Sequence, residues 1–292
     1  AIGLLGIAAL LPVAQHLANR GSDADRGAIA GHAAMGVFQA REMGNPKNWL
    51  RASGVAFAAG DSDYPLNPAG TRAFCLDPRG VAAGVTAALP SAGTMTRITL
   101  RSEPGSATGA MGVQLADNYF SWSDDLDFVI DENDATQPAA QKPEPSAASF
   151  EKRYSPNDFT WMATLVRELS GDRYTLSIVV FRKRDVSATV ELTSPCTILS
   201  AGIGGGDVKL TNANAAGIAP GSWVMLSDTA GRFRWYRVIY AADYVSGTTS
   251  RELTLAGRDW DGGAAATATI IPGVVAVYER TVRLEQTNPW MR

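Results

Sequence analysis

The chain has 292 residues, of which 46% are hydrophobic, enough for one large domain or two smaller ones with a substantial core. Its net charge is −3, from 26 basic and 29 acidic residues, and no basic cluster is longer than FRKRD at 181–185. A nucleic-acid partner needs a positively charged surface, so this composition excludes that class of partner.

The first fifteen residues, AIGLLGIAALLPVAQ, carry no charged side chain. A helix that crosses a bilayer needs roughly 20 apolar residues, so the run is too short to do so alone. It also lacks the basic start and the small-residue cleavage site of a signal peptide. A buried core helix is the alternative interpretation of this run.

From residue 13 to residue 43, small and apolar residues recur at steps of three and four, which predicts a long amphipathic helix. The repeat consists of Val13, Leu17, Gly21, Ala24, Ala28, Gly31, Met35 and Phe38. We expect Gly44 to be the C-cap, because Pro46 cannot continue a helix. Upstream, Pro12 follows Gly3 and Gly6, so the helix is expected to kink or unwind between Gly3 and Val13.

The two histidines, His16 and His32, both fall on this predicted helix, sixteen residues apart. At that spacing they can neither bind one metal ion together nor form a catalytic pair. Both are expected on the helix surface.

The segment AIGLLGIAALLP, leading into a long amphipathic helix, resembles the amino-terminal segment of type IV pilins and pseudopilins, including their helix-interrupting proline, here Pro12. The segments NWLRASG, DDLDF and DRYTLSIVVFRKRD are similar to large pilin-like proteins of planctomycete type. The resemblance is specific over residues 1–50, diffuse to residue 190 and absent beyond it. It implies that about ten residues precede the segment, which would restore a span of roughly 20.

The same resemblance implies assembly into a filament through the amino-terminal helix. The side chains expected to form that assembly surface are Ile2, Leu4, Leu5, Ile7, Leu10, Leu11, Pro12 and Leu17.

Further along the chain, residues 51–96 are rich in Gly, Pro, Ala and Asp and predict a long ordered loop. A strand is expected at 96–102 and a short helix within 109–122. The segment 135–149 has the Pro, Ala, Gln and Ser content of a mobile surface loop. Alternation then predicts a hairpin of strands 159–169 and 173–185, with a third strand at 186–192.

Residues 195–272 contain short strands separated by Gly-rich turns, which predicts a small antiparallel barrel inserted before a last strand at 274–284. Four aromatic residues in this module, Trp223, Phe233, Trp235 and Tyr236, are expected in the barrel core, with a sugar-binding platform as the alternative. The predicted domains are an N-terminal helix at 1–50, a pilin-like domain at 51–194, the inserted module at 195–272 and a returning strand at 273–292. The predicted fold class is α+β, with the long N-terminal helix packed on an antiparallel sheet.

Candidate chemistry is sparse. Asp124, Asp125, Asp127 and Asp131 supply the oxygen ligands that Ca²⁺ prefers, yet the intervening LDFVI is strand-like and no Gly provides the sharp turn of a calcium loop. No cofactor is therefore expected, and Ca²⁺ is the weak alternative. Neither cysteine lies near a second Cys or a His, so in an exported chain a disulfide between Cys75 and Cys196 is predicted.

The sequence thus favours a structural protein without catalytic residues: a subunit of an extracellular type IV pilus-like filament. Its expected partners are copies of itself, the inner membrane before assembly, and a pilus or secretion assembly machinery, with the assembled filament at the cell surface. A minor or tip pseudopilin, or a surface adhesin of a type II secretion-like or pilus system whose β module binds a ligand, is the alternative. A membrane-anchored enzyme with a glycosidase-type acid pair is a third hypothesis, because such pairs need no short motif.

Overall fold

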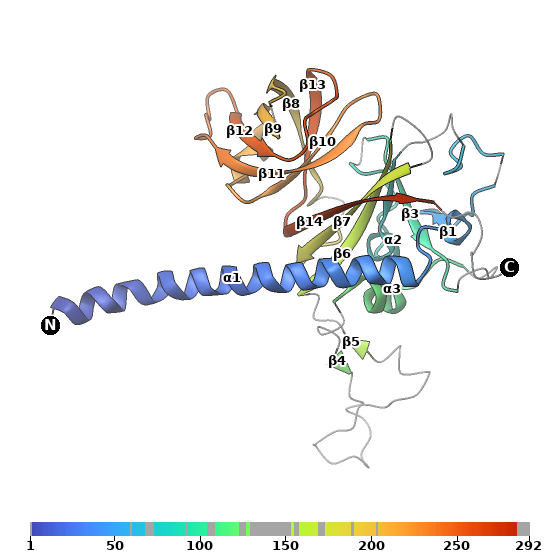
Figure 1. The fold of residues 1–292 in the computed structure, drawn as a ribbon, viewed down its shortest axis with the longest axis horizontal. Helices are drawn as coiled ribbons and strands as arrows, with labels where there is room; N and C mark the ends of the chain where they lie inside the picture. The colour runs from blue at the N-terminus through green and yellow to red at the C-terminus, as the bar shows by residue number, and fades with distance from the viewer. Residues whose placement is uncertain are drawn as a thin grey trace, which may run out of the picture.

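The computed structural model describes residues 2–58, 60–67, 73–90, 93–103, 109–122, 127–128, 153–154, 158–168, 173–187, 190–202 and 204–284, and the side chains of these residues except 2–20, 127–128 and 153–154. A long helix, α1 (Ile2–Ala40), lies below a six-stranded sheet, and a closed barrel lies above it (Figure 1). The shorter elements are η1 (Pro46–Asn48), α2 (Pro78–Ala82), α3 (Val113–Phe120), η5 (Ala213–Gly217) and the β4 (Asp127–Phe128) and β5 (Arg153–Tyr154) pair.

The predicted α+β class, with an antiparallel sheet, is wrong. Strands make up 44% of the chain and helices 20%, so the protein is mostly β. The sheet is mixed rather than antiparallel, because β2 (Ala73–Leu76) pairs with β3 (Thr96–Leu100) in parallel. The six strands of the sheet and the six of the barrel together contain more residues than the helices, which makes the fold mostly β.

The mixed sheet has the strand order β1-β3-β2-β6-β7-β14. Its remaining strands are β1 (Trp49–Arg51), β6 (Phe159–Arg167), β7 (Arg173–Arg182) and β14 (Val274–Arg283). The predicted hairpin corresponds to β6 and β7, whose register pairs Phe159 with Arg182. The predicted loop at 51–96 is wrong at its centre, because β2 lies between β3 and β6 and is fully buried.

Strand β6 is buried on both faces, which explains its continuous apolar character. Trp161 and Leu165 lie on the face of β6 that packs against the helices. Met162 points to the opposite face and belongs to the hydrophobic cluster between the sheet and the barrel. A sheet covered on both faces buries both sets of alternating side chains. The sheet is therefore the middle layer of the molecule.

The last half of α1 contributes Ala30, Ala34 and Phe38 to the core on the helix side of the sheet. The helix ends at Ala40 and not at Gly44 as predicted. Glu42 has a φ of 51°, its N–H donates to the Gln39 carbonyl at 3.1 Å, and the Met43 N–H donates to the Phe38 carbonyl at 3.0 Å. These are the two bonds of a Schellman cap, with Glu42 in the left-handed position that glycine usually occupies.

The predicted unwinding between Gly3 and Val13 does not occur, because helical backbone continues from Ile2 through Pro12. A proline removes one helical hydrogen bond, while the neighbouring turns keep theirs.

The barrel interrupts the chain between β7 and β14, two strands that are neighbours in the sheet. Its closed order is β10-β11-β12-β9-β8-β13. The barrel strands are β8 (Leu192–Ser200), β9 (Gly205–Thr211), β10 (Trp223–Ser227), β11 (Phe233–Ala241), β12 (Ser250–Ala256) and β13 (Ala265–Ile270).

The aromatic residues of the barrel divide between two cores. Tyr236 is buried inside the barrel, as predicted. Phe233 and Trp235 instead pack on the sheet in a cluster with Phe181, and Trp223 is partly buried beside them. The prediction of a barrel core is wrong for Trp223, Phe233 and Trp235: the face of β11 that carries Phe233 and Trp235 is turned toward the sheet, and Trp223 packs against the same cluster. The Trp235 indole N–H donates to the Thr164 hydroxyl at 3.1 Å.

Candidate functional site

The close packing of α1 against β14 depends on two glycines of the helix. A Cβ at Gly31 would lie 2.2 Å from the Tyr278 ring, and one at Gly27 would lie 3.3 Å from Val275. The exposed ring of His32 lies 5.2 Å from that of Tyr278. Among the described side chains of α1, the buried ones are Gly27, Ala30, Gly31, Ala34 and Phe38, and only Gly31 and Phe38 of these belong to the predicted stripe. The buried face is therefore shifted from the predicted one, and its small residues allow close contact between the helix and the sheet within a single subunit.

The helix leaves the sheet near Asp23, which accepts a charge-assisted hydrogen bond from the Arg182 guanidinium at the end of β7. Toward its N-terminus the helix continues beyond the sheet (Figure 1). All eight predicted assembly residues lie in this part: Ile2, Leu4, Leu5, Ile7, Leu10, Leu11, Pro12 and Leu17. Their side chains, and that of His16, lie outside the described part of the chain.

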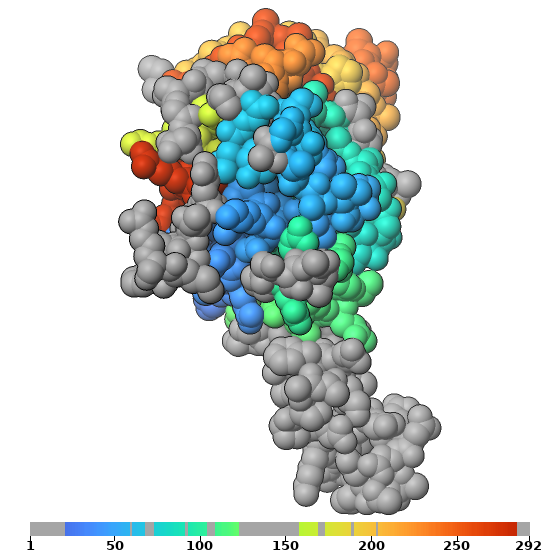
Figure 2. Space-filling view, turned by 90° about the vertical axis from the view of Figure 1, so that its right-hand side faces the viewer, coloured from blue at the N-terminus to red at the C-terminus, as the bar shows by residue number. Residues whose placement is uncertain are grey.

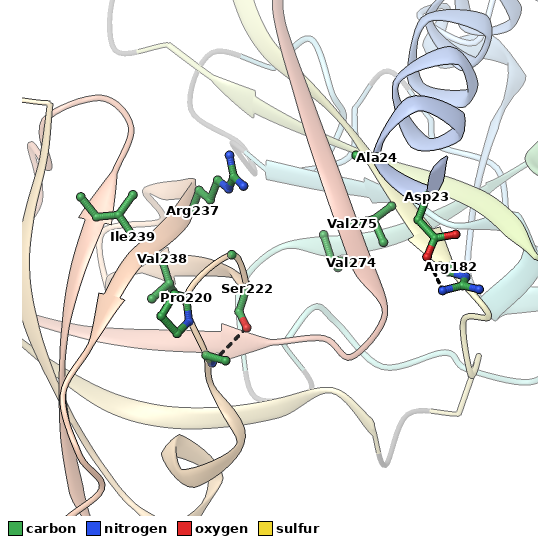
Figure 3. Close-up of a pocket in the computed structure, with 12 residues that line it drawn as sticks. Asp23, Ala24, Arg182, Pro220, Ser222, Arg237, Val238, Ile239, Val274 and Val275 are labelled. Carbon is green, nitrogen blue, oxygen red and sulfur yellow. Dashed lines mark hydrogen bonds and ion pairs between the residues drawn. The ribbon is translucent and has the colours of Figure 1, made fainter. Parts of the chain in front are cut away.

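A cleft of about 900 Å³, here called the helix–barrel cleft, opens where α1, the barrel and the start of β14 meet (Figure 3). It is lined by Asp23, Ala24, Arg182, Ala219, Pro220, Gly221, Ser222, Arg237, Val238, Ile239, Val274 and Val275. Figure 3 shows Arg237 extending from β11 toward α1 and β14, while Arg182 pairs with Asp23 on the opposite wall. The walls therefore combine apolar side chains with two guanidinium groups.

A β-bulge shapes the barrel side of this cleft. The pairing of β11 with β12 shifts between Val238 and Tyr240, so that Ile239 has no partner in the register. Ile239 is 56% exposed and Tyr240 is 60% exposed. Because alternate strand residues normally face opposite sides, the bulge is what allows two consecutive large side chains to face solvent.

A smaller pocket of about 300 Å³ lies between the sheet and the barrel and is rich in arginine. Its charged residues are Arg167, Glu168, Arg232, Arg234, Arg258, Asp261 and Glu279. Arg234 donates bidentate hydrogen bonds to the Asp261 carboxylate, at 3.2 and 2.9 Å. These hydrogen bonds lower the pKa of Asp261. The pocket contains four arginines and three carboxylates, so the carboxylates offset most of the positive charge of the arginines.

A buried charge cluster, which the sequence did not reveal, joins the chain entering the barrel to the sheet. Arg97 donates to both oxygens of Glu191, at 2.6 and 2.7 Å, and also to Asp77. Arg184 donates to both oxygens of Asp77, each at 2.7 Å. All four residues are less than 9% exposed. The predicted strand at 186–192 is wrong: the residues described from 186 to 191 form no strand, and Glu191 turns toward Arg97.

Burial alone would raise the pKa of Asp77, but the Arg184 charge, its hydrogen bonds and the Arg97 charge hold that pKa well below its usual range. For Glu191, burial outweighs Arg97 and raises the pKa. Asp77 also accepts from the Gly80 N–H at 3.1 Å and so caps α2. Each group of the cluster is thus committed to the fold rather than presented to a ligand.

The proposed metal ligands cannot be placed: Asp124, Asp125 and Asp131 lie outside the described residues, as does the side chain of Asp127, in β4. Within the part of the chain whose side chains are described, no group of three His, Cys, Asp or Glu residues is arranged to hold a metal ion.

The predicted disulfide is wrong. Cys75 and Cys196 are both free thiols. Cys75 is buried between the sheet and the barrel, whereas Cys196 is buried in the barrel's own core, so the two sulfurs belong to separate clusters. Burial raises the pKa of each thiol to about 12.

Among the described helices, none is sufficiently long and apolar to cross a bilayer. No known protein family and no curated protein matches the chain. One solved structure found to be similar, a crystal structure of the Ad16 fiber knob, is 10% identical over 55% of this chain and 92% of that chain, with a TM-score of 0.11. A TM-score this low carries no argument about fold or function.

Proposed function

We propose that this chain is a structural subunit of an extracellular type IV pilus-like filament, membrane-anchored before assembly and assembled through the first half of α1. The observation that carries the proposal is the extent of this helix. It has 39 residues, its N-terminal part extends beyond the sheet (Figure 1), and residues 2–15 of the apolar run lie in that part.

An apolar helix that extends beyond its own domain needs another cover, because exposed apolar surface costs about 25 cal/mol per Å². Lipid provides that cover before assembly, and the same segment of neighbouring subunits provides it afterwards. Small residues such as Gly3 and Gly6 permit close helix approach, and Leu5 and Ile7 fill the space between helices. A contact of this kind is head-to-tail, so it propagates into a filament.

The test replaces Leu5 or Ile7 with Asp. An unpaired charge in the helix core is too costly to bury, so filaments should be lost while the sheet and barrel remain folded. The matched control is Val113→Asp, at a 56% exposed position on α3. Electron microscopy of sheared cell-surface material, with the subunit identified by mass, gives the readout.

Normal filament yield from the Leu5→Asp variant would overturn the proposal. A filament that contains this chain only at low stoichiometry would instead favour a minor or tip subunit. The exposed Ile239 and Tyr240 at the bulge favour that second function, since they offer a contact surface on the barrel.

A further inference from the structure

The end of the barrel nearest α1 carries a concentrated apolar surface. Of the seven large hydrophobic side chains that are exposed in the described part of the chain, three lie within seven residues: Ile239, Tyr240 and Val245. They belong to the end of β11 and to the loop that follows it, and are here called the β11 patch. Exposed apolar side chains gathered in one place mark an interaction surface.

The β11 patch lies toward the N-terminal end of β14. Strand β11 begins at Phe233, which lines the arginine-rich pocket together with Glu279. It then reaches Ile239, which lines the helix–barrel cleft together with Val274. Strand β11 therefore runs from the middle of β14 toward the residue at which β14 begins.

Helix α1 projects from the sheet in that same direction. A side chain at Gly27 would contact Val275, and one at Gly31 would contact Tyr278, so earlier helix residues lie toward the start of β14. The helix thus leaves the sheet at the end that β11 reaches. Figure 1 shows the result, since the barrel reaches further toward the N-terminus of α1 than the sheet does.

The charges beside the patch favour an anionic partner. The exposed Arg237 extends into the helix–barrel cleft (Figure 3), and its guanidinium makes no hydrogen bond or ion pair with a described residue. Arg251 donates to the carbonyls of Ala242 and Ala216, at 2.7 and 2.9 Å, and to no carboxylate. Asp243 is the one acidic residue between these arginines in the sequence, so the segment 237–251 has a net positive charge.

We propose that the β11 patch lies on the surface of the bilayer that holds α1 before assembly, with Arg237 at the phosphate of an anionic phospholipid. Exposed aromatic rings suit the headgroup level of a membrane, and unpaired basic side chains are attracted to anionic lipids. The inference rests on the membrane anchoring in the proposed function and adds a second lipid contact to it. Extraction of the subunit into a filament releases the patch.

The height of the patch along α1 fits this contact. Asp23, in the wall of the cleft, follows the last residue of the apolar run, Gln15, by eight residues, about 12 Å at ~1.5 Å per residue. It follows the first charged residue, Arg20, by only three. The headgroup region on one side of a bilayer is roughly 5 to 8 Å thick. Since β11 continues past the cleft to Ala241, its end reaches the headgroups.

The opposite end of the molecule provides a control position. The Arg41 guanidinium lies 4.3 Å from the centre of the Tyr119 ring of α3, eighteen residues along the chain from Asp23. Figure 2 views this end, with α3 (green) below the end of α1 (blue) and the barrel (orange) at the top. Val113 on α3 is 56% exposed, close to the 52% of Val245 in the patch.

Labels on the full chain in vesicles of phosphatidylcholine and phosphatidylglycerol test the contact. A polarity-sensitive fluorophore is attached in turn to Val245→Cys, Val113→Cys and Leu5→Cys, and the buried native thiols do not compete. A lipid with a nitroxide at its headgroup should quench the Val245 label and leave the Val113 label unquenched. A lipid with a nitroxide in its acyl chain should quench the Leu5 label, which reports the anchor.

A second measurement tests the role of Arg237. Arg237→Gln should lower the ratio of lipid-bound to free Val245 label about fivefold, as expected for the loss of one basic side chain near an anionic surface. The matched control is Arg258→Gln, another exposed arginine of the barrel, which lines the arginine-rich pocket at the start of β11 and should leave the ratio unchanged.

The three labels separate this contact from the anchor. A Val245 label as accessible to water as the Val113 label, in a protein whose Leu5 label lies among acyl chains, would overturn the contact and leave the anchor intact. A Leu5 label in water would overturn the anchor, and the contact with it. Equal effects of the two arginine changes would overturn the assignment of Arg237 to the phosphate.

Discussion

The ring of Tyr278 occupies the space that a side chain at Gly31 would fill, since a Cβ there would lie 2.2 Å from Cε2. The change Gly31→Ala therefore requires either the Tyr278 ring or α1 itself to move. We expect it to lower the free energy of unfolding by about 1 to 3 kcal/mol, as overpacking does, measured by denaturant titration.

The matched control for this prediction is Gly36→Ala, since a Cβ at Gly36 has no atom within 4 Å. It should stabilise by about 0.5 to 1 kcal/mol through helix propensity. Adding Tyr278→Ala to Gly31→Ala should recover part of the loss. Equal effects at the two glycines would contradict the close packing of helix and sheet.

The buried charge cluster predicts a pH-dependent stability. The folded pKa of Asp77 lies below the unfolded value of about 3.9, so its stabilisation is fully present above pH ~4 and is lost as the pH falls toward the folded pKa. The change Asp77→Asn should cost about 3 to 5 kcal/mol at neutral pH, because the buried Arg184 guanidinium loses its carboxylate partner and Arg97 keeps only Glu191. The cost should shrink below pH ~4, measured by thermal melts across pH.

Glu191 cannot produce this acid loss, because its raised folded pKa favours the folded state on protonation. The control is Asp158→Asn, whose carboxylate lies 3.9 Å from Lys183 at the surface and should change stability little at any pH. A pH-independent cost of Asp77→Asn would show that its role is packing alone.

The bond between Trp235 and Thr164 joins the barrel to the sheet. The change Thr164→Val keeps the shape of the side chain but leaves the indole N–H without its acceptor, at an expected cost of about 1 to 3 kcal/mol in a chemical denaturation curve. Four residues earlier, Thr160 buries its hydroxyl without a partner on the same face. Thr160→Val should be neutral or stabilising, and a larger loss there than at residue 164 would contradict the assignment.

The cap of α1 predicts a gain in stability. Glu42 has a φ of 51°, which glycine adopts without strain, so Glu42→Gly should stabilise by up to about 1 kcal/mol. Ala40→Gly, in the last helical position, should destabilise by about 0.5 to 1 kcal/mol. Differential scanning calorimetry of the pair checks the sign, and a loss at Glu42→Gly would argue against the cap.

The free thiols predict a simple chemical result. Because both thiols are buried and have a pKa of about 12, neither Cys75 nor Cys196 should react with a thiol reagent at pH 8 in the folded protein. Both should react after unfolding without a reductant. Zero thiols in the unfolded, unreduced protein would restore the disulfide hypothesis.

Local hydrophobic patterns in the sequence predicted those elements whose buried face repeats with the period of a strand or a helix. Alternation from Phe159 to Arg182 gave β6 and β7, and the 3.6-residue repeat gave α1. In contrast, Ala73–Leu76 is only four apolar residues among glycines and prolines, so nothing local distinguished a central strand from a loop.

Long-range chemistry explains the remaining differences. The β-branched residues at 186–192 favour a strand, but the described residues before Leu192 form none, and Glu191 pairs with Arg97, 94 residues earlier. Alternation correctly implied that Trp235 is buried, but it could not show whether the covering surface is the barrel or the sheet. At the candidate site, the helix–barrel cleft joins segments that no sequence spacing brings together.

The barrel enters and leaves the fold at adjacent strands, where the Arg182 N–H donates to the Gly273 carbonyl at 2.8 Å. A chain that turned directly from β7 into β14 would form an ordinary β-hairpin. The six barrel strands are therefore an insertion that another module could replace. The exchange has one condition: Met162, Val179 and Phe181 are covered by the barrel, so any ancestral or engineered replacement must bring its own apolar cover for that face of the sheet.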